Sequence, residues 1–156
     1  MTNKELITKF YDSFAKGDIE SMIDCYHDDI VFQDPAFGTL KGEMAKNMWR
    51  MLLTRREATT KITCTQVTET TEGGTAQWVA SYIYGPKKRK VVNHVSAQMA
   101  ISDEKITIHT DNFDMWKWTQ QALGTTGYLL GWTSFMKGKI QHKLNTMLTK
   151  FSNNDS

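Results

Sequence analysis

The chain has few of the residues that cross-link or interrupt a fold: its 156 residues include two cysteines and two prolines. Cys25 and Cys64 stand apart without metal-ligand spacing, so neither a disulfide framework nor a cysteine metal site is expected. Apolar runs are short, and none reaches the roughly 20 residues that a membrane-spanning helix needs. The N-terminus also lacks the apolar segment of a signal peptide. We therefore expect a cytoplasmic protein.

An excess of charge of one sign is also missing, because 19 Lys and Arg face 17 Asp and Glu, for a net charge of +2. So mild a balance, without an arginine-rich stripe, argues against a nucleic-acid partner. The basic run 87–90 follows Gly85 and Pro86 and is expected at a hairpin tip. The sequence contains no phosphate-binding glycine loop, nucleophile elbow or metal triad, so we expect neither a metal nor an organic cofactor.

The periodicity of apolar residues predicts three helices and one strand in the first part of the chain, followed by further strands. Apolar residues at spacings of three and four predict helices over residues 5–16 and 42–55, with a short helix after Asp18 between them. A first strand ends at Asp34. Four later segments, rich in Thr, Ile and Val, alternate like strands. These segments are residues 61–71, 75–84, 91–101 and 105–113. This order is typical of an α+β fold with helices packed on one face of an antiparallel sheet.

The C-terminal part adds apolar and basic sequence to this body. A helix is predicted over 115–123, and a last amphipathic helix carries an apolar stripe from Ile140 to Phe151 opposite several lysines. We therefore divide the chain into a domain at 1–123 and an extension at 124–156. The amphipathic helix fits docking on the body or on a partner subunit, or contact with an anionic membrane surface through Trp132, Phe135 and the lysines.

Three segments together resemble the nuclear transport factor 2-like superfamily, in its SnoaL-like or ketosteroid-isomerase-like branch. They are residues 10–18 (FYDSFAKGD), 26–35 (YHDDIVFQDP) and 109–114 (HTDNFD). The resemblance implies a cone in which a curved antiparallel or mixed sheet wraps around about three helices and leaves a deep apolar pocket. It also implies a homodimer formed through the outer face of the sheet. That face is expected to carry Val92, His94, Ser96 and Gln98.

Two acids in strand-like apolar segments, Asp34 and Asp111, are the candidate catalytic groups, because carboxylates are rarely buried without a partner. If Asp111 faces inward, His109 and Phe113 do so too, since strand side chains alternate. The resemblance places Asp34 at the position that the general base occupies in the isomerases. It places Asp111 at the position of the catalytic acid or base in epoxide hydrolases and polyketide cyclases, with His109 beside it. An Asp before Pro35 is also explained by hydrogen bonds within the local turn.

The departures from the resemblance leave the reaction open. The isomerases bind the oxyanion with a tyrosine and a protonated acid. The equivalent positions in this chain hold Phe10 and, nearby, Ala97, and neither side chain can donate a hydrogen bond to an oxyanion. Tyr11 lies about 100° further around the helix. The Asp and Arg of the epoxide hydrolases fall near Tyr82 and Ala80. Steroid isomerisation and epoxide hydrolysis are therefore both disfavoured.

Eight side chains are candidates to line a pocket for a hydrophobic small molecule, although each is also typical of plain core. They are Phe10, Phe14, Trp49, Trp78, Tyr82, Met99, Phe113 and Trp116. Two functions remain. One is a cofactor-independent isomerase, cyclase or hydrolase that uses acid–base carboxylates. The other is a non-catalytic binding or assembly module for an apolar ligand.

Overall fold

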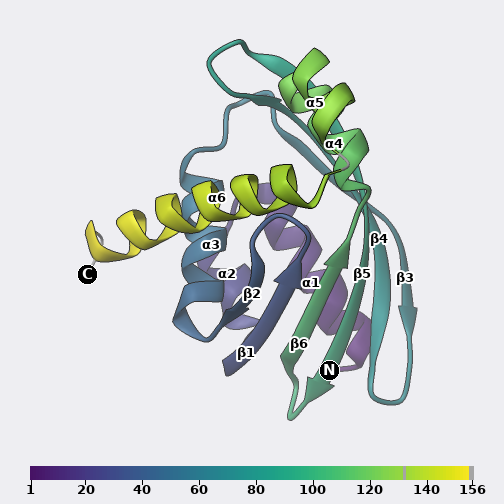
Figure 1. Ribbon diagram of the computed structural model, residues 1–156. Coiled ribbons are helices and arrows are strands. Elements are labelled where there is room, and N and C mark those ends of the chain that lie inside the picture. Colours follow the sequence, from purple (N-terminus) through teal and green to yellow (C-terminus); the bar gives the residue numbers. More distant parts are fainter. Residues whose placement is uncertain (132, 155–156) are drawn as a thin grey trace.

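The computed structural model of the protein describes residues 1–131 and 133–154 and combines helices with one mixed sheet (Figure 1). The helices are α1 (Asn3–Lys16), α2 (Ile19–Asp24), α3 (Glu43–Thr54), α4 (Met115–Leu123), α5 (Thr125–Leu130) and α6 (Ser134–Asn154). The strands are β1 (Tyr26–Asp34), β2 (Gly38–Lys41), β3 (Lys61–Glu69), β4 (Gly73–Tyr84), β5 (Arg89–Ser102) and β6 (Lys105–Asn112).

The sheet has the strand order β2-β1-β6-β5-β4-β3. Its neighbours are antiparallel except for β1 and β6, which run parallel. The sheet curves around the N-terminal helices (Figure 1). The predicted α+β fold with a curved mixed sheet is therefore confirmed. The short strand β2 was not predicted, because four residues carry too little alternation to be recognised.

Local sequence signals explain where α1 and α2 begin and end. The Thr2 hydroxyl accepts a hydrogen bond from the Glu5 amide, and the Glu5 carboxylate accepts one from the Thr2 amide, which forms a capping box. Gly17 ends α1 at φ 74°, a left-handed conformation that glycine adopts at little cost. Asp18 then caps α2. The apolar face of α1 packs against β3 and β4.

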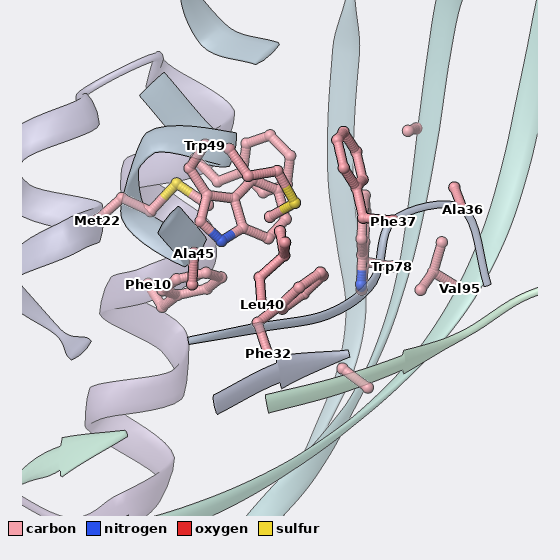
Figure 2. Packing of buried hydrophobic residues seen from close by; sticks show 14 of the residues in the cluster. Phe10, Met22, Phe32, Ala36, Phe37, Leu40, Ala45, Trp49, Trp78 and Val95 are labelled. Atoms are coloured by element: carbon pink, nitrogen blue, oxygen red, sulfur yellow. The ribbon is translucent and has the colours of Figure 1, made fainter. Parts of the chain in front are cut away.

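The core lies between the helices and the inner face of the sheet. Figure 2 shows its aromatic members gathered there: Phe10 from α1, Phe32 from β1, Trp49 from α3 and Trp78 from β4. Strand β5 alternates as predicted. Its side chains at 95, 97 and 99 are buried, whereas His94 is exposed.

The C-terminal segment is more helical than the sequence indicated. Asp114 caps α4 through the Lys117 amide, as expected for an acid at this position. Helix α5 lies at the start of the extension predicted at 124–156, and α6 begins six residues before Ile140. Trp132 lies outside the described residues. None of the described helices is both long and apolar enough to cross a membrane.

Helix α6 lies over α3 and the β1–β2 hairpin (Figure 1). The Asn145 side chain donates to the Phe37 carbonyl at 2.9 Å, and the Asn47 side chain donates to Ser152 at 3.1 Å. Met136, Ile140 and Leu148 of α6 join the same buried cluster as the rest of the chain. The division at 123/124 stays a prediction.

Candidate functional site

Strand β6 aims its two candidate catalytic residues into the core. His109 is fully buried and Asp111 is 3% exposed, whereas Ile108, which directly precedes His109, is 49% exposed. This is the alternation that the sequence predicted for the strand. The buried carboxylate therefore lies on the inner face of the sheet.

Four buried side chains from three elements form a continuous hydrogen-bonded chain. The indole Nε1 of Trp49 donates to the Tyr26 hydroxyl at 2.9 Å. The same hydroxyl lies 2.7 Å from Nδ1 of His109. His109 Nε2 then lies 2.8 Å from Oδ1 of Asp111. Helix α3 and strands β1 and β6 thus meet at one imidazole.

The first bond has a fixed direction, because an indole N–H can only donate and the Tyr26 oxygen therefore accepts from Trp49. We assign the Tyr26 proton to the second bond, in which the hydroxyl donates to Nδ1 of His109. This leaves the ring proton on Nε2, where it is donated to Asp111. In this arrangement each of the four side chains has a hydrogen-bond partner. His109 is therefore placed to orient Asp111 rather than to carry protons to solvent.

Asp34 sits at the end of β1, where the chain turns into β2. Its Oδ1 accepts the amides of Ala36 at 2.9 Å and Phe37 at 2.6 Å, which is the local turn interpretation of an Asp before proline. Burial nevertheless raises the pKa of Asp34 to about 6, and the negative charge of Asp111 adds to the effect. Asp34 therefore stabilises the local turn and is also an acid with a raised pKa.

Two further polar atoms are buried without a hydrogen-bond partner in the described part of the chain: the Tyr11 hydroxyl and the Trp78 indole nitrogen. Burial holds the pKa of Tyr11 well above its usual range, and the charge of Asp111 raises it further. Tyr11 is thus a protonated donor near Asp111. The angle around the helix made it a doubtful candidate, and only its unpaired hydroxyl in the structure identifies it.

The predicted pocket residues divide into three groups. Phe10, Phe14, Trp49, Trp78 and Met99 are buried. Tyr82 and Phe113 are partly buried. Trp116 is 39% exposed, because the inward position of α4 is taken by Trp118 two residues later. The Trp116 indole nitrogen donates to the Tyr128 carbonyl instead, away from the other seven residues.

Aromatic rings pack directly on the His109 imidazole. The centroids of Phe10 and Phe32 lie 5.4 and 5.1 Å from it at nearly right angles, and Trp49 stacks on it at 6.2 Å. Tyr82 is engaged elsewhere, because its hydroxyl accepts from Trp118 at 2.7 Å, and burial raises its pKa to about 12. Asp111 is bonded to His109, as the strand period predicted.

The hollows found on the described residues lie elsewhere. One, of about 610 Å³, lies between α1 and Glu69 of β3. The other, of about 450 Å³, lies beside α2 and includes Lys46 and Lys105. Neither includes Asp34, His109 or Asp111, so the interior pocket stays a prediction. The described residues also contain no group of three His, Cys, Asp or Glu placed to hold a metal ion.

The comparison with family models gives one match. The model described as a SnoaL-like domain covers residues 7–109, which is about two thirds of the chain and runs from within α1 to His109 on β6. Asp111 lies just beyond the matched range. No curated protein matches the sequence.

Solved structures with the same fold include three with named activities or ligands. TerC, co-crystallised with polyporic acid, is 17% identical with a TM-score of 0.65 over 76% of this chain and 96% of its own. An LEH-like epoxide hydrolase of M. tuberculosis is 17% identical, with a TM-score of 0.66 over 81% and 94%. A putative polyketide cyclase of Pseudomonas putida is 16% identical, with a TM-score of 0.66 over 78% and 98%. At such identities the likeness is one of fold.

Proposed function

Because the chain belongs to the SnoaL-like domain family, we propose that it is a cofactor-independent enzyme that transfers protons on a hydrophobic, carbonyl-bearing small molecule. Asp111 is the base and Asp34 is the acid. The observation that carries this proposal is the buried Asp111 carboxylate, which His109 holds by one oxygen beside a second acid of raised pKa.

The two carboxyl groups differ in the way that acid–base catalysis requires. One Asp111 oxygen is held by Nε2 of His109 at 2.8 Å. Asp34, with a pKa of about 6, remains partly protonated near neutral pH. Two neighbouring acids in different environments are typical of assigned acid and base roles.

The remaining groups favour proton transfer at carbon over epoxide opening. The positions that resemble the epoxide hydrolases' Asp and Arg hold Tyr82 and Ala80, which carry no charge at neutral pH. Tyr11 supplies an unpaired O–H near Asp111, which suits the oxygen of an enolate formed next to a carbonyl. An isomerisation or an aldol-type cyclisation needs no more than these groups.

A second candidate function rests on the packing around His109. Four aromatic rings lie within 5.1–6.2 Å of the imidazole, and the hydrogen bonds that begin at Trp49 are typical of a well-ordered core. A non-catalytic module that binds an apolar ligand fits this packing. It requires Asp111 only as a structural acceptor.

Hydrogen–deuterium exchange separates the two functions without knowledge of the product. Apolar ketones and β-diketones are incubated with the protein in D₂O, and exchange of the protons next to the carbonyl is followed by NMR. We expect Asp111→Asn to lower the exchange rate by about 10²–10⁴-fold, the usual contribution of a general base. The control Asp103→Asn changes an exposed turn residue and should leave the rate unchanged. Exchange at the background rate with the wild-type protein across the panel would favour the binding module.

A further inference from the structure

Positive charge is concentrated at one part of the chain, although the net charge is small. Residues 115–154 hold five lysines and no acid, and residues 85–90 hold three lysines and one arginine. All 17 acidic residues lie outside these two segments. The nearest in sequence are Asp114, which caps α4, and Asp155, which lies outside the described residues. The rest of the protein is correspondingly acidic.

The same segments expose apolar surface. The described residues contain eight exposed large apolar side chains, and five of these belong to α4, α5 and the start of α6. They are Trp116 (39%), Tyr128 (58%), Leu129 (59%), Leu130 (48%) and Phe135 (79%). Clusters of this kind mark interaction sites, whereas scattered single apolar residues do not.

Hydrogen bonds and packing bring the basic and apolar groups to one end of the molecule. Arg89 in the β4–β5 hairpin donates to the Gln121 carbonyl of α4 at 2.7 Å, and the Gln121 side chain accepts the Val92 amide at 2.8 Å. Arg89 also lies against Gly124, where α5 begins. Figure 1 shows the hairpin tip and α5 at the same end of the fold. We call this end, residues 85–90 with 116–131 and 133–139, the basic apolar end.

We propose that the basic apolar end binds the surface of an anionic lipid membrane. Exposed apolar side chains insert at the boundary between headgroups and acyl chains, and surrounding lysines contact anionic headgroups. Lys87, Lys88 and Lys90 at the hairpin tip are all exposed and supply this charge, as do Lys137 and Lys139 next to Phe135. The proposal is independent of the chemistry at Asp111.

The chemistry of the surface favours a membrane over other anionic partners. A nucleic acid would use the lysines but would leave Leu129, Leu130 and Phe135 in water. A second copy of this chain would bring two basic segments of equal sign together, which opposes association at low salt. A membrane surface satisfies both the apolar and the basic groups.

Vesicle sedimentation tests the proposal with the full-length protein. We expect binding to phosphatidylcholine vesicles that contain phosphatidylglycerol, little binding to phosphatidylcholine alone, and loss of binding in high salt. Lys87→Gln, Lys88→Gln and Lys90→Gln together should weaken binding by about fivefold for each lysine. The matched control combines Lys16→Gln, Lys41→Gln and Lys61→Gln, which are exposed lysines elsewhere.

The apolar contribution is tested separately. Leu130→Ser with Phe135→Ser should also weaken vesicle binding, whereas Leu52→Ser, an exposed leucine on α3, should not. Circular dichroism checks that each variant is folded. Failure to sediment with anionic vesicles, or equal weakening by both lysine triples, would overturn the proposal. It would also be overturned if light scattering showed that the two serines dissociate a dimer while vesicle binding is absent, because the surface would then belong to a second copy.

Discussion

The side chains of His109 and Asp111, two positions apart on β6, meet at 2.8 Å inside the core. Residues so spaced share one face of a strand, and here that face is buried. The imidazole occupies one carboxylate oxygen and, through Nδ1, is fixed by Tyr26. Among the residues that the structure describes, the other Asp111 oxygen has no hydrogen-bond partner, and the proposed base function uses this oxygen. The pair therefore orients one group rather than providing two independent catalysts.

Tyr26→Phe should destabilise the protein, because the lost hydroxyl is both the acceptor for Trp49 and the donor to His109. Two buried groups would be left without partners, and a loss of roughly 1–3 kcal/mol in the free energy of unfolding is expected. Urea denaturation measures it. The control Tyr128→Phe removes a hydroxyl from a side chain that is 58% exposed, and a change below about 0.5 kcal/mol is expected there. Equal effects of the two substitutions would contradict the hydrogen-bonded chain.

The raised pKa of Asp34 predicts a pH-dependent cost to stability. An acid whose pKa is higher in the folded than in the unfolded protein holds more protons when folded, so the free energy of unfolding falls as pH rises. For Asp34 the fall spans the interval from its ordinary value of 3.8 to about 6. Above that interval the ionised form costs roughly 3 kcal/mol.

Asp34→Asn should remove this cost while keeping the oxygen that accepts from Ala36 and Phe37. We expect the variant to be more stable than the wild type at pH 7.5 and to lose that advantage at about pH 4. Urea denaturation at both pH values checks the sign. A stability difference that does not vary with pH would show that Asp34 titrates at its ordinary pKa.

Asp34 should also set a pH limit on turnover. If it acts as the acid, its protonated form declines as the pH rises through about 6, and the rate of carbonyl-adjacent exchange should decline with it. Asp34→Asn should flatten this part of the pH–rate profile. A profile that is unchanged by the substitution would remove Asp34 from the reaction and leave Asp111 as the remaining candidate.

Much of the fold could be predicted because its local signals are strong. Gly17 and Asp18 mark a helix boundary by backbone conformation and capping, and the alternation around Val95 identifies the inward face of β5. The parallel pairing of β1 with β6 could not be predicted in this way. It joins segments far apart in the sequence, and no local pattern encodes the partner of a strand.

The candidate site could be predicted only in part, for a related reason. Strand period placed His109 and Asp111 on one face, so their contact was predictable. The roles of Tyr26 and Tyr11 depend on three-dimensional contacts between elements. Tyr26 begins β1, and its hydroxyl reaches His109 on β6. The spacing of apolar residues on α4 does not show which side of the helix faces the sheet. For this reason the sequence could not distinguish Trp116 from Trp118 as the inward residue.

The homodimer stays a prediction, and the outer face of β5 offers a way to test it. His94, Ser96 and Gln98 are exposed there, as an interface through this face requires. His94→Glu with Gln98→Glu would place like charges on both copies of a two-fold contact. Light scattering should give a dimer for the wild type and a monomer for the variant. A wild-type monomer at micromolar concentration would reject the dimer.

Tyr11→Phe should move stability and function in opposite directions. The Tyr11 hydroxyl is buried without a partner in the described residues, so its removal should leave the free energy of unfolding unchanged or raise it by up to about 1–3 kcal/mol. Tyr26→Phe, which removes a bonded hydroxyl from the same core, should lower the free energy of unfolding.

If Tyr11 donates to the developing oxyanion, Tyr11→Phe should also slow carbonyl-adjacent exchange by about a hundredfold, the usual effect of removing one such donor. A hydroxyl that serves the core alone would lower stability when removed and leave exchange by the folded protein unchanged. Unfolding and exchange measured on the same two variants therefore show whether the unpaired hydroxyl is reserved for a ligand.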